Sequence, residues 1–203
     1  LVNAQGCDSV VTLHLTAVPI VVRASNLATC DGDTILVPLV LENAMGISAM
    51  SLTLNYPGQN LRYLGYQQVN PTLSQANLLL NATIVNGVNQ VRLAWFNLVP
   101  VNISSGILLS LRFVVEQPSF SSLVWDLNNL GMCEFADEFG DSVRNMVYHN
   151  GLIQSGGSQS AISATLCQGQ SYFFDGSARS TTGVYTSNYP DHLGCDSIVV
   201  LNL

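Results

Sequence analysis

The sequence predicts an all-β chain, with one large β-sandwich followed by a smaller β module. Apolar and polar residues alternate with a period of two in short runs that are rich in β-branched and aromatic residues. Clusters of turn-forming residues separate these runs. A length of 203 residues suits one large or two small domains. Together these observations indicate a dozen or more strands in two β modules.

The alternation is clearest at 51–56, 91–95 and 109–115, where we expect strands with one buried face. Between the strands we expect turns at Asp31–Asp33, Pro57–Gly58, Asn86–Gly87, Ser104–Gly106, Gly140–Asp141 and Asn150–Gly151. Segment 70–80 fits either one or two helical turns or a loop excursion, because its Asn-Pro start suits both.

An internal repeat sets the expected module boundaries. Residues 6–15 and 194–203 are identical at seven of ten positions, at an offset of 188. A tandem array of modules explains this match most simply. The small residues of 155–160 are typical of a flexible linker. The predicted division is a tail strand of a preceding small module at 1–16, a sandwich at 17–154, a linker at 155–160 and a small β repeat module at 161–203.

The composition favours a secreted or cell-surface protein. Only 9% of the residues are charged, and the formal net charge is −7. All the basic residues are scattered arginines, which makes nucleic acid a poor partner. The longest apolar stretches, such as 35–41, are far shorter than the roughly 20 residues that a membrane span needs. Because the chain starts at Leu1 without a signal peptide, we expect a mature piece of a longer protein.

The five cysteines predict disulfides in an oxidising compartment. Cys167 and Cys195 bracket the small module, and we expect them to pair as its staple. Cys7 matches Cys195 in the repeat, so its partner is expected upstream of this chain. Cys30 and Cys133 are then left for each other across the sandwich. The alternative is that either one is a buried free thiol.

The central block resembles a cohesin domain over roughly residues 18 to 154. The segments that carry the resemblance are Gly32–Asn43, Gly46–Tyr56, Leu61, Val91–Trp95, Gly106–Phe113, Glu134–Asp137, Gly140 and Gly151–Ile153. The resemblance implies a nine-stranded jelly-roll sandwich. A Cys30–Cys133 pair departs from cellulosomal cohesins and is similar to cohesin-like domains in large surface proteins of bacteria that use type IX secretion. The flanking motifs at 167–176, 183–185 and 194–197 resemble short repeats of the same proteins.

No catalytic constellation stands out, so we expect a protein that is not an enzyme. The three histidines lie in unrelated segments, and neither a nucleophile motif nor a metal-ligand spacing of His and Cys occurs. The aromatic residues that a sugar-stacking strip would use are Tyr56, Tyr63, Tyr66, Trp95 and Trp125. Trp95 is in phase with Val91 and Leu93, which favours core packing for it.

One acidic group is a candidate metal site. A bridge between Cys30 and Cys133 would gather several carboxylates at one end of the sandwich. They are Asp31, Asp33, Glu134 and Asp137. Calcium takes several oxygen ligands from such loops and is the one cofactor that we consider. The alternative is a solvated acidic rim.

Four segments have the pattern Asp, then Ser or Thr, then an aliphatic residue, which resembles the acceptor motif of a bacterial O-glycosylation system. The hydroxyl residues in this pattern are Ser9, Thr34, Ser142 and Ser197. Glycans would keep a charge-poor surface soluble. The alternative is turn chemistry, in which the Asp and Ser side chains bond to nearby backbone before a strand.

The function that the sequence predicts is a structural or adhesive segment of a long extracellular bacterial protein, with neighbouring copies or repeats as partners. One alternative is a cohesin that binds a dockerin-type partner, which requires a flat, partly polar sheet face. Another is a carbohydrate-binding module, which requires exposed coplanar aromatic rings. Strand 8–15 is an open edge that would complete a preceding module, by covalent continuity or by strand addition between chains.

Overall fold

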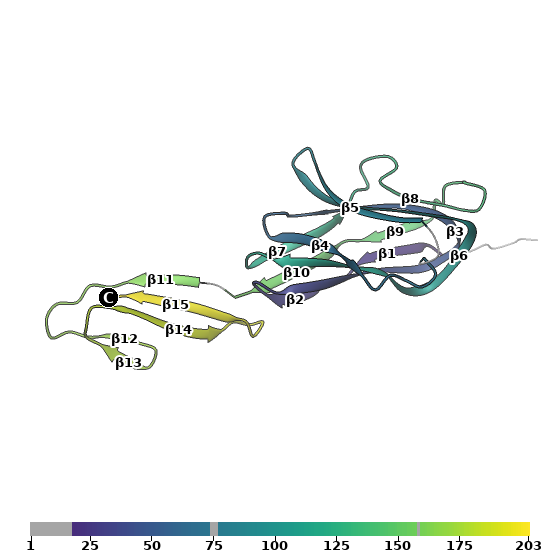
Figure 1. Cartoon of the computed structure of the whole chain (residues 1–203). Coiled ribbons are helices and arrows are strands. Elements are labelled where there is room, and N and C mark those ends of the chain that lie inside the picture. The colour runs from purple at the N-terminus through teal and green to yellow at the C-terminus, as the bar shows by residue number, and fades with distance from the viewer. Residues whose placement is uncertain (1–17, 74–76, 158) are drawn as a thin grey trace, which may run out of the picture.

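The computed structural model describes residues 18–73, 77–157 and 159–203, and these form an all-β chain. Figure 1 shows an elongated molecule, with a large sandwich joined end to end with a small module. The sandwich strands are β1 Ile20–Ala24, β2 Leu27–Cys30, β3 Thr34–Tyr56, β4 Leu61–Gln67, β5 Asn77–Val85, β6 Val88–Val115, β7 Ser119–Trp125, β8 Cys133–Ala136, β9 Met146–His149 and β10 Gly151–Gly156. The described residues contain no helix that could cross a membrane.

Two long strands organise the sandwich, because β3 and β6 pair antiparallel over nearly their whole length. The first half of β3 also pairs with β1, while its second half pairs with β8. Likewise the first half of β6 pairs with β5, and its second half with β4. One layer therefore contains β9, β1, β3, β6 and β4, and the other contains β5, β6, β3 and β8.

The bend of β3 between the two layers is built at residues 43–47. The register with β6 shifts there, and Asn43 and Gly46 have φ values of 59° and 68°. Glycine and asparagine adopt this left-handed conformation most easily. The backbone nitrogen of Gly46 donates a 2.7 Å hydrogen bond to Oδ1 of Asn102 on β6. These irregularities let one strand serve both layers.

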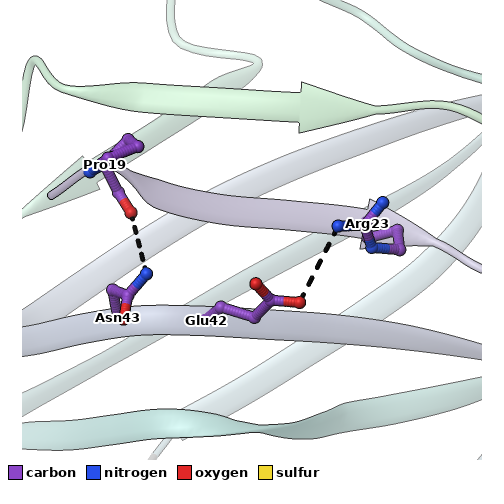
Figure 2. Close-up of polar contacts among 4 residues, drawn as sticks. All are labelled: Pro19, Arg23, Glu42 and Asn43. Carbon is purple, nitrogen blue, oxygen red and sulfur yellow. Dashed lines mark hydrogen bonds and ion pairs between the residues drawn. The ribbon is translucent and has the colours of Figure 1, made fainter.

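Polar contacts hold β1 against β3 beside this bend (Figure 2). The Asn43 amide nitrogen donates to the carbonyl oxygen of Pro19 at 3.2 Å. Nη2 of Arg23 lies 3.8 Å from Oε1 of Glu42. Because both charged side chains are partly exposed, the ion pair contributes at most about 1 kcal/mol.

The core lies between the two layers and follows the alternation in the sequence. Its largest fully buried side chains include Trp95, Phe113, Phe135, Leu41, Ile47, Leu52 and Leu54. Trp95 is only 2% exposed, which confirms its predicted core position. Asn86 and Gly87, with φ values of 51° and 80°, form the predicted turn between β5 and β6. This is the backbone that a tight two-residue hairpin turn requires.

Segment 70–80 begins as a loop, as one of the two predicted alternatives has it. The backbone nitrogen of Leu73 donates to the carbonyl oxygen of Asn70 at 2.9 Å and closes a turn. The strand β5 then begins at Asn77.

The small module contains five short strands and a small core. They are β11 Gln159–Ser163, β12 Tyr172–Phe174, β13 Ser177–Arg179, β14 Val184–Pro190 and β15 Asp196–Asn202. β15 lies between β11 and β14, while β12 and β13 form a separate hairpin. The module buries few apolar side chains, chiefly Phe174 and Leu201. So small a core needs an additional tie.

That tie is a disulfide to the sandwich, because Cys30 is bonded to Cys195 with a Cα–Cα distance of 5.4 Å. The predicted pairs Cys30–Cys133 and Cys167–Cys195 are therefore wrong. β2 runs parallel to β10, and β10 leads directly into the small module. Cys30, the last residue of β2, therefore lies beside the turn between β14 and β15. Cys133 instead opposes Leu52 on β3, far along the sandwich. Cys133 and Cys167 are free thiols, and Cys7 lies outside the described residues.

Strands also occupy most of the segment that was expected to be a linker at 155–160. β10 extends to Gly156, and β11 begins at Gln159. Across this joint, the Gln154 side-chain nitrogen lies 2.8 Å from Nε2 of His192. The backbone nitrogen of Gly157, which directly follows β10, donates to Oδ2 of Asp191 in the small module at 2.8 Å. The two modules therefore meet through hydrogen bonds as well as through the disulfide.

Candidate binding face

One of the outer sheet surfaces of the sandwich is the outward side of β5, β6, β3 and β8. We call it the open face. The register places its outward side chains in rows across the four strands. One row is Ala136, Ala49, Phe96 and Asn77, and the next is Glu134, Ser51, Ala94 and Leu79. The third is Thr53, Arg92 and Asn81, in which Thr53 is buried and its hydroxyl contacts Met132. Their neighbours along each strand point into the core.

The middle of the open face is a floor of small side chains, formed by Ala49, Ser51, Ala94 and Ala136. With strands about 4.8 Å apart, four strands span roughly 14 Å between the outer two. An α-helix with its side chains is about 10–12 Å wide. A surface of this width, with little projecting from its middle, lets the backbone of one helix approach closely.

Two hollows mark the floor and meet at Ser51. One has a volume of about 410 Å³ and lies between Thr53, Leu79, Arg92 and Met132. The other, of about 240 Å³, lies between Ser51, Glu134 and Gly140. Both are open to solvent. The open face therefore offers shape and contact area to a ligand.

Two loops border the floor, and Figure 1 shows them on the side of β5 and β8. The loop before β8 is anchored at buried Asp126, whose carboxylate accepts bonds from the Asn129 amide at 2.9 and 3.0 Å. In the loop after β8, Oδ1 of Asp137 accepts from the backbone nitrogens of Phe139 and Asp141. The tips carry Leu130 and Phe139, which are 97% and 81% exposed.

Apolar side chains also flank the floor on its other edge. Leu79 is 70% exposed, Phe96 51% and Leu98 93%. Single exposed apolar residues are common, but several beside one flat sheet surface are typical of an interaction site. The open face thus combines a flat centre with projecting apolar side chains on both sides.

The two charged groups of the open face have opposite signs and do not pair with each other. The ion pairs among the described residues are Arg23–Glu42 and Arg62–Glu116. Arg92 is held by Oε1 of Gln90, which lies 2.8 Å from Nη2 and 3.1 Å from Nε. Oε1 of Glu134 accepts from the backbone nitrogen of Gly131 at 3.0 Å. Both charges keep hydrogen-bonding capacity for a ligand.

The predicted acidic cluster does not form, because the bridge that would have gathered it is absent. Asp33 accepts hydrogen bonds from Thr29 and from the Cys30 backbone, whereas Glu134 and Asp137 bind their own loops beside β8. Within residues 18–73, 77–157 and 159–203, no three His, Cys, Asp or Glu side chains are grouped to hold a metal ion. Calcium binding stays a prediction for which the described residues offer no such donor set.

The predicted glycosylation residues lie apart from one another. Thr34 begins β3 and Ser142 follows the loop after β8, and both are exposed. Ser197 lies on β15 and is partly exposed. Ser9 lies outside the described residues. Modification of these hydroxyl groups stays a prediction.

The aromatic residues considered for a sugar-stacking strip do not form one on the surface. Trp95 and Trp125 are 2% and 3% exposed. Tyr56 and Tyr63 pack edge to face against Phe113, with ring centroids 5.2 and 5.6 Å apart. Burial raises the pKa of Tyr63 to about 12. These rings contribute to the core, which leaves only Tyr66 of the set exposed.

Sequence reasoning did not single out the residues of the floor. The signal was nonetheless present, because Ala49, Ser51 and Thr53 alternate with the large apolar residues of the same strand. Identifying them as one surface requires the pairing of β3 with β6 and β8, which the sequence does not specify.

The class of molecule that these features define is a jelly-roll β-sandwich of the cohesin-like type. The chain is similar to the non-cellulosomal cohesin from the hyperthermophilic archaeon Archaeoglobus fulgidus, with 22% identity and a TM-score of 0.55 over 68% of this chain and 92% of that one. It is also similar to the sixth cohesin of scaffoldin B from Acetivibrio cellulolyticus, solved with a dockerin, with 17% identity and a TM-score of 0.56 over 68% and 100%.

A third similar structure belongs to the type I cohesin–dockerin complex of Coh-OlpA from Clostridium thermocellum. Its identity is 13% and its TM-score 0.56, over 68% of this chain and 99% of that one. No family model and no curated protein matches the chain. At these identities the likeness shows the fold, and it agrees with the resemblance found in the sequence.

Proposed function

We propose that the sandwich is a protein-recognition module whose open face binds a helical partner of the dockerin type. The observation that carries this proposal is the floor of small side chains on β6, β3 and β8, bordered by exposed apolar residues. A recognition function fits this surface, because a flat floor with exposed apolar side chains on both sides is typical of an interaction site.

Two similar solved structures support the choice of partner, because they are cohesins in complex with dockerins. The two charged residues of the open face further specify the side chains expected on this partner. Glu134 favours a basic side chain on the partner, and Arg92 favours an acidic one. Exposed Leu79 and Phe96 favour apolar residues along one side of the helix.

The experiment measures retention of purified dockerin modules, including those of the two complexes above and those of the source organism, on immobilised chain. Ala94→Arg places a long charged side chain in the middle of the floor. The matched control is Ala161→Arg, at an exposed strand position of the small module. We expect the wild type and the control to retain a dockerin and Ala94→Arg to lose it. Retention by none of the proteins, or equally by all three, contradicts the proposal.

A second function that a specific observation favours is that of a segment in a long extracellular bacterial protein. The observation is the disulfide-tied pair of modules together with the repeat of residues 6–15 at 194–203. Disulfides persist in oxidising, extracellular environments, which supports secretion to the cell surface. Imaging of the native protein tests this function, which requires regularly spaced copies of the two modules; isolated single modules contradict it.

A further inference from the structure

The Cys30–Cys195 disulfide divides the chain in an unequal way. The two cysteines are 165 residues apart, so nearly the whole sandwich and most of the small module lie inside the covalent loop. Outside the loop, the described part of the chain contains only 18–29 and 196–203. A force applied to the two ends of the chain therefore has a covalent path that avoids everything between the two cysteines.

The geometry aligns this path with the long axis of the molecule. In Figure 1, β1 starts at the end of the sandwich remote from the small module, and the C-terminus lies beyond β15 at the other end. The arrows of β1, β2 and β15 point the same way along that axis. The disulfide joins the end of β2 to the start of β15, at the joint between the modules. The path is thus β1, β2, the disulfide and β15.

Each strand on this path is held along its length by neighbours. β1 is parallel to β9 and antiparallel to β3, β2 is parallel to β10, and β15 lies between β11 and β14. Backbone hydrogen bonds run across the strand direction. A pull along the strand therefore loads many of them together instead of opening them one at a time.

We propose that the Cys30–Cys195 disulfide is a mechanical bypass, which carries tension between the two ends of the chain and keeps residues 31–194 from being drawn out. The bypass follows from connectivity and strand direction alone. One consequence rests on the proposed function: the open face lies inside the protected loop and stays folded while the chain is under tension.

The test is single-molecule stretching of the full chain between handles at its two ends. An extended residue spans at most roughly 3.3–3.6 Å. Opening the 165-residue loop therefore releases about 540–590 Å of additional contour length. We expect this gain with Cys30→Ser/Cys195→Ser and its absence in the oxidised wild type. The matched control is Cys133→Ser/Cys167→Ser, which removes the two free thiols and should behave as the wild type does.

A second measurement covers the case in which the double serine variant fails to fold. The folded wild type is held at low force, and a thiol-free reductant is added. The same additional length should then become available on the next pull. An oxidised wild type that releases the full length without reductant overturns the bypass. Because contour length does not depend on a partner, this result is separable from dockerin binding, and Ala94→Arg should leave it unchanged.

Discussion

Oδ2 of Asp191 accepts a 2.8 Å hydrogen bond from the backbone nitrogen of Gly157, so a side chain of the small module holds the residue that follows the last sandwich strand. Its Oδ1 accepts from the backbone nitrogens of Leu193 and Cys195, at 2.8 and 3.0 Å. A Cβ atom at Gly156 would collide with this carboxylate, which explains the glycine there. One aspartate thus shapes the β14–β15 turn and docks it onto the sandwich.

The first prediction concerns the pH dependence of this joint. The hydrogen bond from Gly157, then those from Cys195 and Leu193, lower the pKa of Asp191 from its ordinary value of 3.8. A lowered pKa means that ionised Asp191 stabilises the folded joint fully above that value, and that the contribution is lost as the pH falls through the folded pKa. We expect Asp191→Ala to melt below the wild type at neutral pH, and the two melting temperatures to converge in strong acid.

The control for this measurement is Glu138→Ala, which removes one exposed carboxylate from the loop after β8. It should follow the wild-type melting curve throughout. A difference between Asp191→Ala and the wild type that persists undiminished in strong acid contradicts the assigned role of the carboxylate.

The second prediction compares the two buried tryptophans. Nε1 of Trp125 donates a 2.9 Å hydrogen bond to the carbonyl oxygen of His149, whereas Nε1 of Trp95 has no acceptor among the described residues. Replacement by Phe removes the same atoms at both sites. Trp125→Phe should therefore lower the free energy of unfolding by about 1 kcal/mol more than Trp95→Phe does. Urea unfolding of both variants measures this, and the reverse order would count against the contact.

The third prediction concerns thiol reactivity. Burial is the largest cause that raises the pKa of Cys133, so little of its reactive thiolate forms near neutral pH. Cys167 is an exposed free thiol. We expect iodoacetamide to modify Cys167 rapidly in the folded protein and Cys133 only after unfolding. Peptide masses identify the labelled sites, and rapid labelling of Cys30 or Cys195 without reductant would contradict the disulfide.

The fourth prediction concerns modification at Thr34, Ser142 and Ser197, and at Ser9 outside the described residues. A fragment of residues 1–203 produced in the source organism should exceed its 21.8 kDa polypeptide mass by discrete sugar increments. Replacing the four hydroxyl residues by Ala should remove those increments. An unmodified native mass shows that these segments serve only as turns and strand starts.

The sequence by itself determined the strands, because alternation reports which side chains a strand must bury. Trp95 in phase with Val91 and Leu93, the Asn86–Gly87 turn and the repeated strand that became β15 all follow from local patterns. Side-chain periodicity and turn conformation each depend on only a few consecutive residues. A local stretch of sequence is therefore enough to predict them. The order of the segments that resemble a cohesin domain then predicted that these strands form a jelly-roll sandwich.

Only the tertiary structure decided which distant residues meet. Cys30 lies nearer in sequence to Cys133 than to Cys195. However, β2 and β10 are parallel and end side by side, and the small module follows β10. Cys30 therefore lies next to Cys195 and bonds to it. The same arrangement keeps Asp33 apart from Glu134 and aligns Ala49 with Ala136. These contacts between distant residues depend on strand order and register. Long-range packing fixes both, and no local pattern of residues encodes them.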